Sequence, residues 1–135
     1  MRVPESILFY KNVLVVDDDN ASFILINELL SNPKLHVFWA DTFQSAHELI
    51  CSDTCFSLII LDYRLPGGKY GTELLPLIKQ TAPEVPVMFI TAVTRNYDFE
   101  IEVHLKNYDV MYKPIDVHDF VCIAKGLLSE VMEFS

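Results

Sequence analysis

The sequence predicts an α/β protein whose parallel sheet is doubly wound, with helices on both faces. Two observations carry this prediction. Short apolar runs alternate with helix-like stretches, in the order strand, helix, five times over, which favours parallel strands joined by helical crossovers. The runs are also apolar throughout, as is typical of strands buried on both faces. They span residues 13–16, 37–39, 56–61, 85–90 and 110–112.

Helical segments are predicted between these strands from the spacing of their apolar residues. The first spans residues 21–31 and ends before the Asn32-Pro33 breaker. The second spans residues 43–52, and Thr42 is a suitable N-cap because its hydroxyl can accept a hydrogen bond from a free backbone N–H.

Two later segments carry their own boundary signals. Residues 72–82 contain Pro76, which a helix tolerates only in or near its first turn. Asp116 is expected to cap a final helix with one apolar face, made of Phe120, Ile123, Leu127 and Val131.

Length and composition indicate a single domain. The chain has 135 residues, of which 51% are hydrophobic, so we expect one domain over residues 1–135 with its core at about 12–132 and no visible output domain. Ten basic residues against 19 acidic ones give a net charge of -9. Without a basic run, direct nucleic-acid binding is not expected, because such binding depends on neutralising phosphates.

Cysteine usage and hydropathy indicate a reducing, cytoplasmic location. Cys51, Cys55 and Cys122 are too few and odd in number for a secreted disulfide framework. Cys51 and Cys55 with His47 lack a fourth metal ligand, so buried or idle thiols are expected. The four histidines are scattered and receive no role. No signal peptide and no apolar run of roughly 18 residues is present, so no membrane span is expected.

Polar residues follow four of the predicted strands. The first strand ends in Asp17, Asp18 and Asp19, the third in Asp62, the fourth in Thr91 and the fifth in Lys113. Ligand sites of parallel sheets lie at the carboxyl ends of the strands, so we expect these side chains to converge. Each alone is more simply a solvated residue at a strand end. Their conjunction is what indicates a site.

Clustered carboxylates repel one another unless a cation neutralises them. Oxygen ligands without histidine or cysteine favour Mg²⁺ over zinc. A divalent ion and Lys113 can together neutralise a transferring phosphoryl group, and a carboxylate can accept that group as an aspartyl phosphate. The sequence therefore predicts phosphoryl chemistry at this edge.

The motifs VLVVDDD, LIILDYRLPG, VMFITA and VMYKP, in this order, resemble the receiver domains of two-component response regulators. The resemblance runs from about Val13 to Met132, and the step of 22 residues from Thr91 to Lys113 is also similar. It implies a flavodoxin-like fold with five parallel strands in the order 2-1-3-4-5. It also implies a phosphoacceptor switch that promotes its own phosphorylation and dephosphorylation, rather than an enzyme.

The resemblance assigns a role to each matching residue. It makes Asp62 the phosphoacceptor, and it makes Asp17 and Asp18 the acidic pair that binds Mg²⁺. Arg64 is implied to add a ligand through its main-chain carbonyl. Asp19 lies beyond the usual pair and is expected to begin a helix.

The remaining matches concern the phosphoryl group itself. Thr91 is implied to be the hydroxyl residue that closes on the phosphate, next to Ala92, and Lys113 is implied to pair with the phosphate. The Lys113-Pro114 peptide corresponds to one that is often cis in the family.

Two departures from the family pattern lie near this site. The loop of residues 67–71 is one residue longer than usual, with Tyr70 where an aspartate is common. Val110 stands three residues before the lysine, where the family commonly has an aromatic ring that moves inward on activation. Tyr112 is expected to leave the sheet on the face opposite Met111, so it is no evident replacement.

The stretch of residues 98–106 alternates apolar and polar residues, which by pattern predicts a strand. A strand here would spoil the crossover between two parallel strands, and the resemblance requires a helix. We therefore expect a helix that is short, shifted or mobile.

Partners are predicted from the first helix and from the resemblance. Phe23 and Ile24 are expected to lie opposite a core-facing stripe and to form a docking patch, although two scattered surface apolar residues are an equal alternative. The stripe consists of Ala21, Ser22, Leu25, Ile26, Leu29 and Leu30. The expected partners are a histidine kinase or histidine phosphotransfer protein and an unknown downstream protein or output domain. A homodimer through the fourth and fifth helices is possible.

Two other functions compete with this interpretation. A receiver fold could serve protein interaction without phosphorylation. A haloacid-dehalogenase-like phosphatase could use Asp17 and Asp19, but Ala21 follows where Thr or Val is wanted, and little chain remains for a cap domain.

Overall fold

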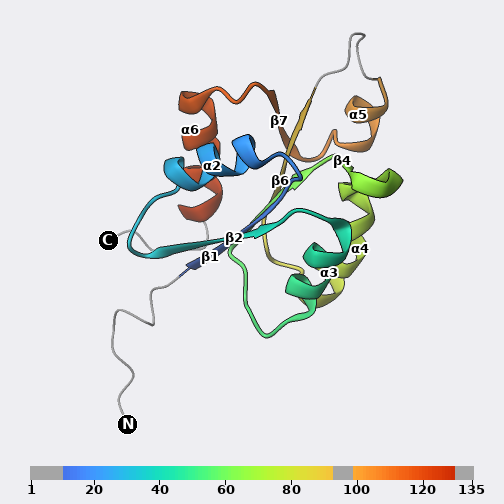
Figure 1. The fold of residues 1–135 in the computed structure, drawn as a ribbon, viewed down its shortest axis with the longest axis horizontal. Helices are drawn as coiled ribbons and strands as arrows, with labels where there is room; N and C mark the ends of the chain where they lie inside the picture. Colours follow the sequence, from blue (N-terminus) through green and yellow to red (C-terminus); the bar gives the residue numbers. More distant parts are fainter. Residues whose placement is uncertain (1–10, 93–98, 130–135) are drawn as a thin grey trace.

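Five parallel strands form one sheet in the order β2-β1-β3-β6-β7, which confirms the expected 2-1-3-4-5 arrangement (Figure 1). A computed structural model describes residues 11–92 and 99–129. The strands are β1 (Lys11–Val16), β2 (Leu35–Ala40), β3 (Leu58–Asp62), β6 (Val87–Ala92) and β7 (Asp109–Lys113). They agree with the five predicted runs to within a few residues at each end.

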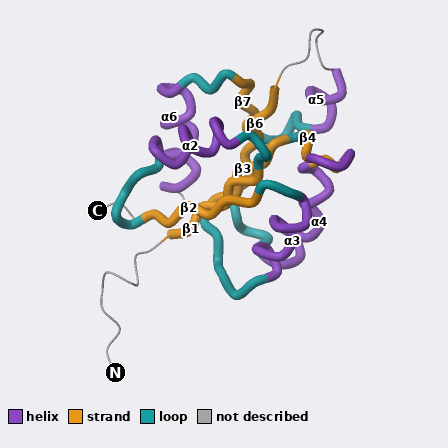
Figure 2. The backbone as a smooth tube through the Cα atoms, in the orientation of Figure 1, coloured by secondary structure: helices purple, strands orange, loops and turns teal. Residues whose placement is uncertain are grey.

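Helices cover both faces of the sheet (Figure 2). On one face lie α2 (Asn20–Leu29) and α6 (Val117–Ser129); on the other lie α3 (Phe43–Cys51), α4 (Leu75–Thr81) and α5 (Phe99–His104). Successive side chains of a strand point to opposite faces. Val13 and Val15 of β1 accordingly pack with Ile26 of α2, whereas Leu14 and Val16 belong to the core under the other three helices.

The parallel register aligns the carboxyl ends of the strands. Val16 of β1 pairs with Leu61 of β3, so Asp17 and Asp62 follow at the same level. Asp62 in turn pairs with Ile90 of β6. All residues of β3 are buried because the strand lies in the middle of the sheet, with both faces covered. The residues that follow the apolar runs therefore meet at one edge.

The predicted helix boundaries hold where a cap or a proline sets them. The Thr42 hydroxyl accepts a hydrogen bond from the Ser45 backbone N–H at the start of α3. The Asp116 carboxylate accepts one from the Asp119 N–H at the start of α6. Pro76 lies in the first turn of α4. The third helix nevertheless differs from prediction, because a 3₁₀ turn, η2 (Gly71–Leu74), occupies its first residues. Val131 of the expected last face lies outside the described residues.

The alternating stretch is a helix, as expected, and it is short. α5 has six residues, Phe99–His104, and residues 93–98 lie outside the described part of the chain. Ile101 and Leu105 are buried four residues apart, which is helical spacing, while Val103 is exposed. The alternation therefore does not mark a buried strand face.

The first helix only partly matches its predicted stripe. Ser22, Ile26 and Leu30 are buried, but Ala21 is exposed, so that part of the prediction is wrong. Ile24 is 52% exposed, as expected. Phe23 is not a free surface residue, because its ring is half-buried and stacks on Trp39 with centroids 4.7 Å apart.

The three cysteines are exposed free thiols, so of the two expected alternatives, buried or idle, burial is wrong. Cys51 lies 3.8 Å from His47 one helical turn away, and the described residues bring no further ligand to that pair. Among the described residues, no helix is both long and apolar enough to cross a membrane.

Candidate functional site

Three carboxylates meet at the carboxyl edge of the sheet. Each of Asp17, Asp18 and Asp62 offers an oxygen that lies within 4.8 Å of those of the other two. Asp17 and Asp62 are only 2% and 7% exposed, and Asp18 is exposed. We call these three residues the acid triad. β1 and β3 are neighbouring strands in register, and this is why residues 45 positions apart come together.

Lys113 brings a positive charge to the triad from the end of β7. Its Nζ lies 2.8 Å from Asp17 Oδ2 and 3.2 Å from Asp62 Oδ2. β6 separates β7 from β3 in the sheet, so the long side chain reaches past the end of that strand. The lysine thus bridges two acids that would otherwise repel each other.

The backbone orients one oxygen of each buried acid. The Asp19 N–H donates to Asp17 Oδ1 (2.9 Å), and the Arg64 N–H donates to Asp62 Oδ1 (3.2 Å). In both cases a carboxylate bonds the backbone two residues further on, a local turn that aspartate favours. The Oδ2 atoms of both residues therefore face Lys113 and the triad.

Burial and charge shift the protonation of the pair. Burial first, and then the neighbouring Asp17 charge, raise the pKa of Asp62 to about 6, although Lys113 acts in the opposite direction. Burial would lower the pKa of Lys113, but its close contacts with the Asp17 and Asp62 carboxylates outweigh burial, and that pKa is raised. Lys113 therefore stays cationic, while Asp62 holds a proton more readily than an ordinary aspartate.

The triad suits a small divalent cation. It offers oxygen donors only, which Mg²⁺ prefers. Asp17 Oδ2 is buried and has no hydrogen-bond donor of suitable geometry among the described residues, although it lies in ion-pair range of Lys113. A buried oxygen without a hydrogen bond is costly, and a cation would satisfy it. No other group of three or more His, Cys, Asp or Glu side chains among the described residues is arranged to hold a metal ion.

Thr91 and Ala92 lie at the end of β6, beside this edge. Thr91 is buried and in register with Tyr112, while Ala92 is exposed and in register with Lys113. Asp62 pairs with Ile90 across the sheet, so Thr91 lies one residue further along β6 than the partner of Asp62. The Lys113-Pro114 peptide is cis, as the resemblance implied.

Asp19 is not part of the triad and begins a helix, as predicted, although its Oδ2 lies 3.9 Å from Lys113 Nζ. Its carboxylate caps α2, where it accepts hydrogen bonds from the Ala21 N–H (3.1 Å) and the Ser22 hydroxyl (2.7 Å). The Ser22 bond is the main reason why the pKa of Asp19 is lowered. Asp17 and Asp18 thus belong to the acid triad, whereas Asp19 caps α2.

The family model for the response regulator receiver domain matches residues 13–125, which include the whole acid triad and Lys113. The chain belongs to the response regulator receiver family. It is therefore a phosphoacceptor signalling module of two-component systems, a switch rather than an enzyme in the usual sense. The acid triad is typical of the magnesium site of such receivers.

Relatives of this receiver differ greatly in length. The chain is 30% identical to the two-component response regulator ORR5 of japonica rice over 112 residues, or 80% of this chain and 81% of that protein. It is 28% identical to the DNA-binding transcriptional regulator NtrC of Klebsiella pneumoniae over 122 residues, which cover 88% of this chain but only 25% of NtrC. This receiver thus spans about a quarter of the length of the NtrC relatives.

A solved structure supports the same fold. The signal receiver domain of a putative Luxo repressor protein from Vibrio parahaemolyticus superposes with a TM-score of 0.75. It is 25% identical in sequence, and the match covers 90% of this chain and 92% of that one.

Residues 64–70 of this receiver fold into a small hairpin beside the triad. β4 (Arg64–Leu65) pairs with β5 (Lys69–Tyr70) through the turn η1 (Pro66–Gly68). Gly67 and Gly68 both have positive φ, 76° and 73°, which the tight turn requires. A Cβ on Gly71 would overlap the main-chain oxygen of Asp62, so this position requires glycine.

Met111 and Tyr112 point to opposite faces of the sheet, as the strand pattern predicted. Met111 is buried, and Tyr112 is exposed on the other face. Val110 packs partly buried against the core under α3, α4 and α5. Tyr108 packs edge-on against Phe89 in the same core, with centroids 5.3 Å apart.

Two contacts of this receiver were not foreseen from the sequence. Tyr63 is buried directly after the acceptor strand, and a 2.9 Å hydrogen bond joins its hydroxyl to His104 Nδ1 on α5. The Trp39 indole N–H donates to the Asp17 main-chain oxygen at 2.7 Å. Tyr63 stands in the LIILDYRLPG motif but was assigned no role there, and Trp39 belongs to none of the four motifs. The only sequence signal was their position at or next to the carboxyl end of a strand.

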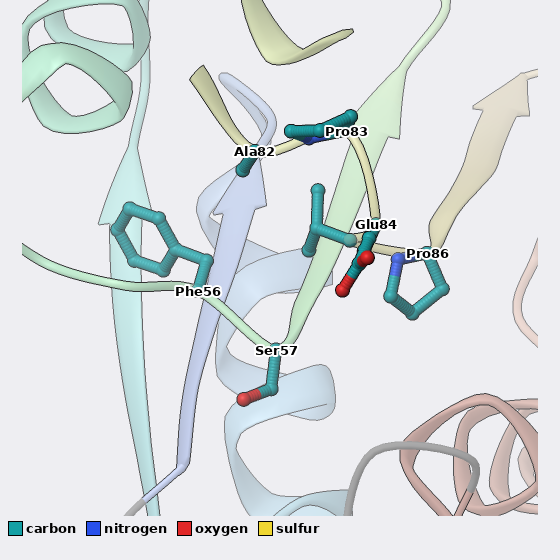
Figure 3. Close-up of a pocket in the computed structure, with 7 residues that line it drawn as sticks. Phe56, Ser57, Ala82, Pro83, Glu84 and Pro86 are labelled. Carbon is teal, nitrogen blue, oxygen red and sulfur yellow. The ribbon is translucent and has the colours of Figure 1, made fainter.

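A cavity of about 690 Å³ lies at the opposite end of the sheet (Figure 3). Phe56 and Ser57 line it before β3, and residues 82–86 line it before β6. None of its lining residues belongs to the candidate site, so the phosphoacceptor chemistry lies elsewhere.

Proposed function

We propose that Asp62 is the residue of this receiver that accepts the phosphoryl group, with Mg²⁺ as cofactor. The observation that carries the proposal is the position of the Asp62 carboxylate. Its Oδ1 is held by the Arg64 N–H, and its Oδ2 lies 3.2 Å from Lys113 within the acid triad. One oxygen is thus fixed, and the other faces the cationic side of the site.

Asp17, Asp18, Asp62 and the main-chain carbonyl of Arg64 would hold the Mg²⁺ ion. The ion would supply charge neutralisation to the transferred group. Because Asp17 and Asp62 are buried side by side, their own repulsion favours binding of a cation.

In the transfer itself, Asp62 Oδ2 forms a bond to phosphorus while the donor's nitrogen–phosphorus bond breaks. The released histidine nitrogen takes a proton from solvent. Lys113 contacts the Asp62 carboxylate in the unphosphorylated protein and would pair with the phosphoryl oxygens after transfer. Thr91 and Ala92 would contact the phosphoryl group from the end of β6.

Membership of the family implies a histidine kinase as partner; a histidine phosphotransfer protein is the other candidate donor. Ile24 remains the exposed part of the proposed docking patch, whereas the Phe23 ring stacks on Trp39. An Ile24→Gln substitution is expected to slow transfer from a cognate donor protein and to leave phosphorylation by a small molecule unchanged. Equal transfer rates from that donor would remove Ile24 from the interface.

Intact-protein mass spectrometry tests the acceptor directly. The protein is incubated with Mg²⁺ and phosphoramidate, and wild type is compared with Asp62→Asn. One phosphoryl adduct is expected on wild type, absent without Mg²⁺ and absent in the variant. Asp19→Asn is the matched control, because it removes a neighbouring charge but keeps a good helix cap, and it should retain the adduct.

An absent adduct on wild type, with magnesium binding shown independently, would contradict the proposal. The chain would then be a receiver fold that binds partners without phosphorylation.

A further inference from the structure

Trp39 lies at the end of β2, a strand that contributes no acid to the triad. Its indole Nε1–H nevertheless donates to the main-chain oxygen of Asp17 at 2.7 Å. The next residue, Ala40, accepts a hydrogen bond from the Asp17 N–H at 3.0 Å. Both peptide groups that flank Asp17 are therefore bound to the last two residues of β2.

The first of these bonds acts on Asp18 through the geometry of the peptide. The Asp17 carbonyl and the Asp18 nitrogen belong to one planar unit, so a fixed carbonyl direction also fixes where the Asp18 side chain begins. Asp18 is exposed, and packing therefore does little to orient it. Water could also bond the Asp17 carbonyl, but it would not hold the peptide in one orientation.

The donor ring is itself held in place. Trp39 stacks on Phe23 with ring centroids 4.7 Å apart and planes 7° from parallel. The backbone N–H of Phe23 donates to the Asp19 carbonyl in the first turn of α2. The ring is 38% exposed, so the stack and the hydrogen bond, rather than full burial, define its position.

We propose that Trp39 is a positioning residue for the acid triad. Its indole N–H orients the Asp17–Asp18 peptide and thereby raises the affinity of the triad for Mg²⁺. This inference rests on the proposed function, because it assumes that the triad binds that ion.

Two substitutions separate the hydrogen bond from the packing of the ring. Trp39→Phe removes the donor but keeps an aromatic face against Phe23. Phe23→Leu removes the aromatic stack and keeps the donor. Isothermal titration with MgCl₂ should show affinity about 3- to 10-fold weaker for Trp39→Phe, the effect expected from one lost hydrogen bond. Phe23→Leu should stay within about 2-fold of wild type, although both variants should unfold at lower urea concentration.

The indole N–H gives a spectroscopic check. The chain has one tryptophan, so a ¹⁵N–¹H spectrum of wild type contains one indole resonance. That resonance should shift in step with Mg²⁺ binding, and Asp18→Asn should abolish the shift.

Three results would overturn the inference. Trp39→Phe that binds Mg²⁺ as tightly as wild type would show that the bond is dispensable. Phe23→Leu that is weakened as much as Trp39→Phe would assign the effect to packing. In both cases wild type still binds Mg²⁺ and takes the phosphoryl group, so the proposed function stands. Wild type that binds no Mg²⁺ would overturn both.

Discussion

Asp62 combines two opposed requirements, because a nucleophilic carboxylate must be ionised while burial beside a second acid favours the protonated form. The raised pKa of about 6 expresses this conflict. The charge of Lys113 opposes this rise in the pKa of Asp62, and a bound cation would oppose it as well. The residue is therefore poised for reaction at a cost to the stability of the metal-free fold.

This conflict predicts an unusual pH dependence for Asp62→Asn without metal. The folded-state pKa of Asp62 is raised from 3.8 to about 6, so its contribution to stability is present below about pH 4 and is lost as pH rises through 6. The uncharged variant should thus be more stable than wild type at pH 7.5, by roughly 1–3 kcal/mol, and the gap should close near pH 4.

Urea unfolding in EDTA across this pH range measures the difference. Asp19→Asn is the control, because the pKa of Asp19 is lowered and its contribution runs in the opposite direction. If the difference in unfolding free energy between wild type and Asp62→Asn does not change with pH, the charge of Asp62 is not what destabilises the fold.

Gly71 is a second residue whose identity the site dictates. An alanine methyl group would overlap the main-chain oxygen of Asp62, and backbone atoms cannot rotate away as a side chain can. Gly71→Ala should therefore destabilise the protein by about 1–3 kcal/mol and slow phosphorylation by phosphoramidate.

Gly126 supplies the matched control for that substitution. It lies in α6 with open space around the position of an added Cβ, so Gly126→Ala should stabilise by up to about 1 kcal/mol. Thermal unfolding and adduct formation measure both variants. Equal behaviour of the two alanines would refute the close approach of Gly71 to the acceptor strand.

At the scale of elements, a side-chain hydrogen bond joins α5 to the residue that follows the acceptor strand. Tyr63 lies buried at the end of β3, and its hydroxyl bonds His104 of the six-residue helix. Ile101 and Leu105 add apolar anchors. A helix this short gains little from its own hydrogen bonds and depends on such contacts.

Tyr63→Phe should therefore loosen α5 while leaving the sheet intact. Loss of one hydrogen bond is expected to cost about 1 kcal/mol, and amide exchange should accelerate in α5 more than in β3. Tyr112→Phe is the control, because that ring is exposed on β7. Unchanged exchange in α5 would show that its apolar anchors suffice.

The elements that could be predicted are those whose signals are local. Strand order and the meeting of Asp17, Asp62 and Lys113 followed from apolar runs and from the family resemblance. The caps at Thr42 and Asp116 followed from residue type. By contrast, η2 replaced the start of the third helix because the hairpin brings Gly71 against Asp62, a constraint between segments that no local pattern carries.

The site residues that the sequence did not indicate are also defined by contacts between distant segments. His104 contacts Tyr63 across 41 positions, and Trp39 contacts Asp17 across 22. Phe23 was expected to be exposed because its own helix leaves it off the core face. The ring stacks on Trp39 of the neighbouring strand and also packs against the core cluster that contains Ile26. The exposed cysteines show the same limit, since residue type alone does not fix the direction of a side chain.

For the whole molecule, negative charge is the dominant electrostatic feature. The net charge is -9, and three of the acids gather at one edge. Added salt screens the general repulsion, whereas a divalent ion bound at the triad stabilises only the folded state. The two effects are separable.

MgCl₂ should raise the melting temperature more than NaCl of the same ionic strength. At about ten times the dissociation constant, linkage gives about 1.4 kcal/mol, or roughly 3–6 °C for a domain of this size. Asp18→Asn should remove this excess and leave the salt response, since Asp18 is exposed and its loss spares the core. An excess that survives in Asp18→Asn would place the stabilising magnesium outside the triad.

The stacked ring of Trp39, at the end of β2, also gives the molecule an intrinsic fluorescence signal. Its one tryptophan hydrogen-bonds the backbone of Asp17 and stacks on Phe23, which precedes the exposed Ile24 in the chain. Emission from a single indole, partly open to solvent, responds to changes in nearby charge and in contact with a partner. Ion binding, acceptor occupancy and capture by a donor protein thus fall within range of one intrinsic optical signal, without any attached label.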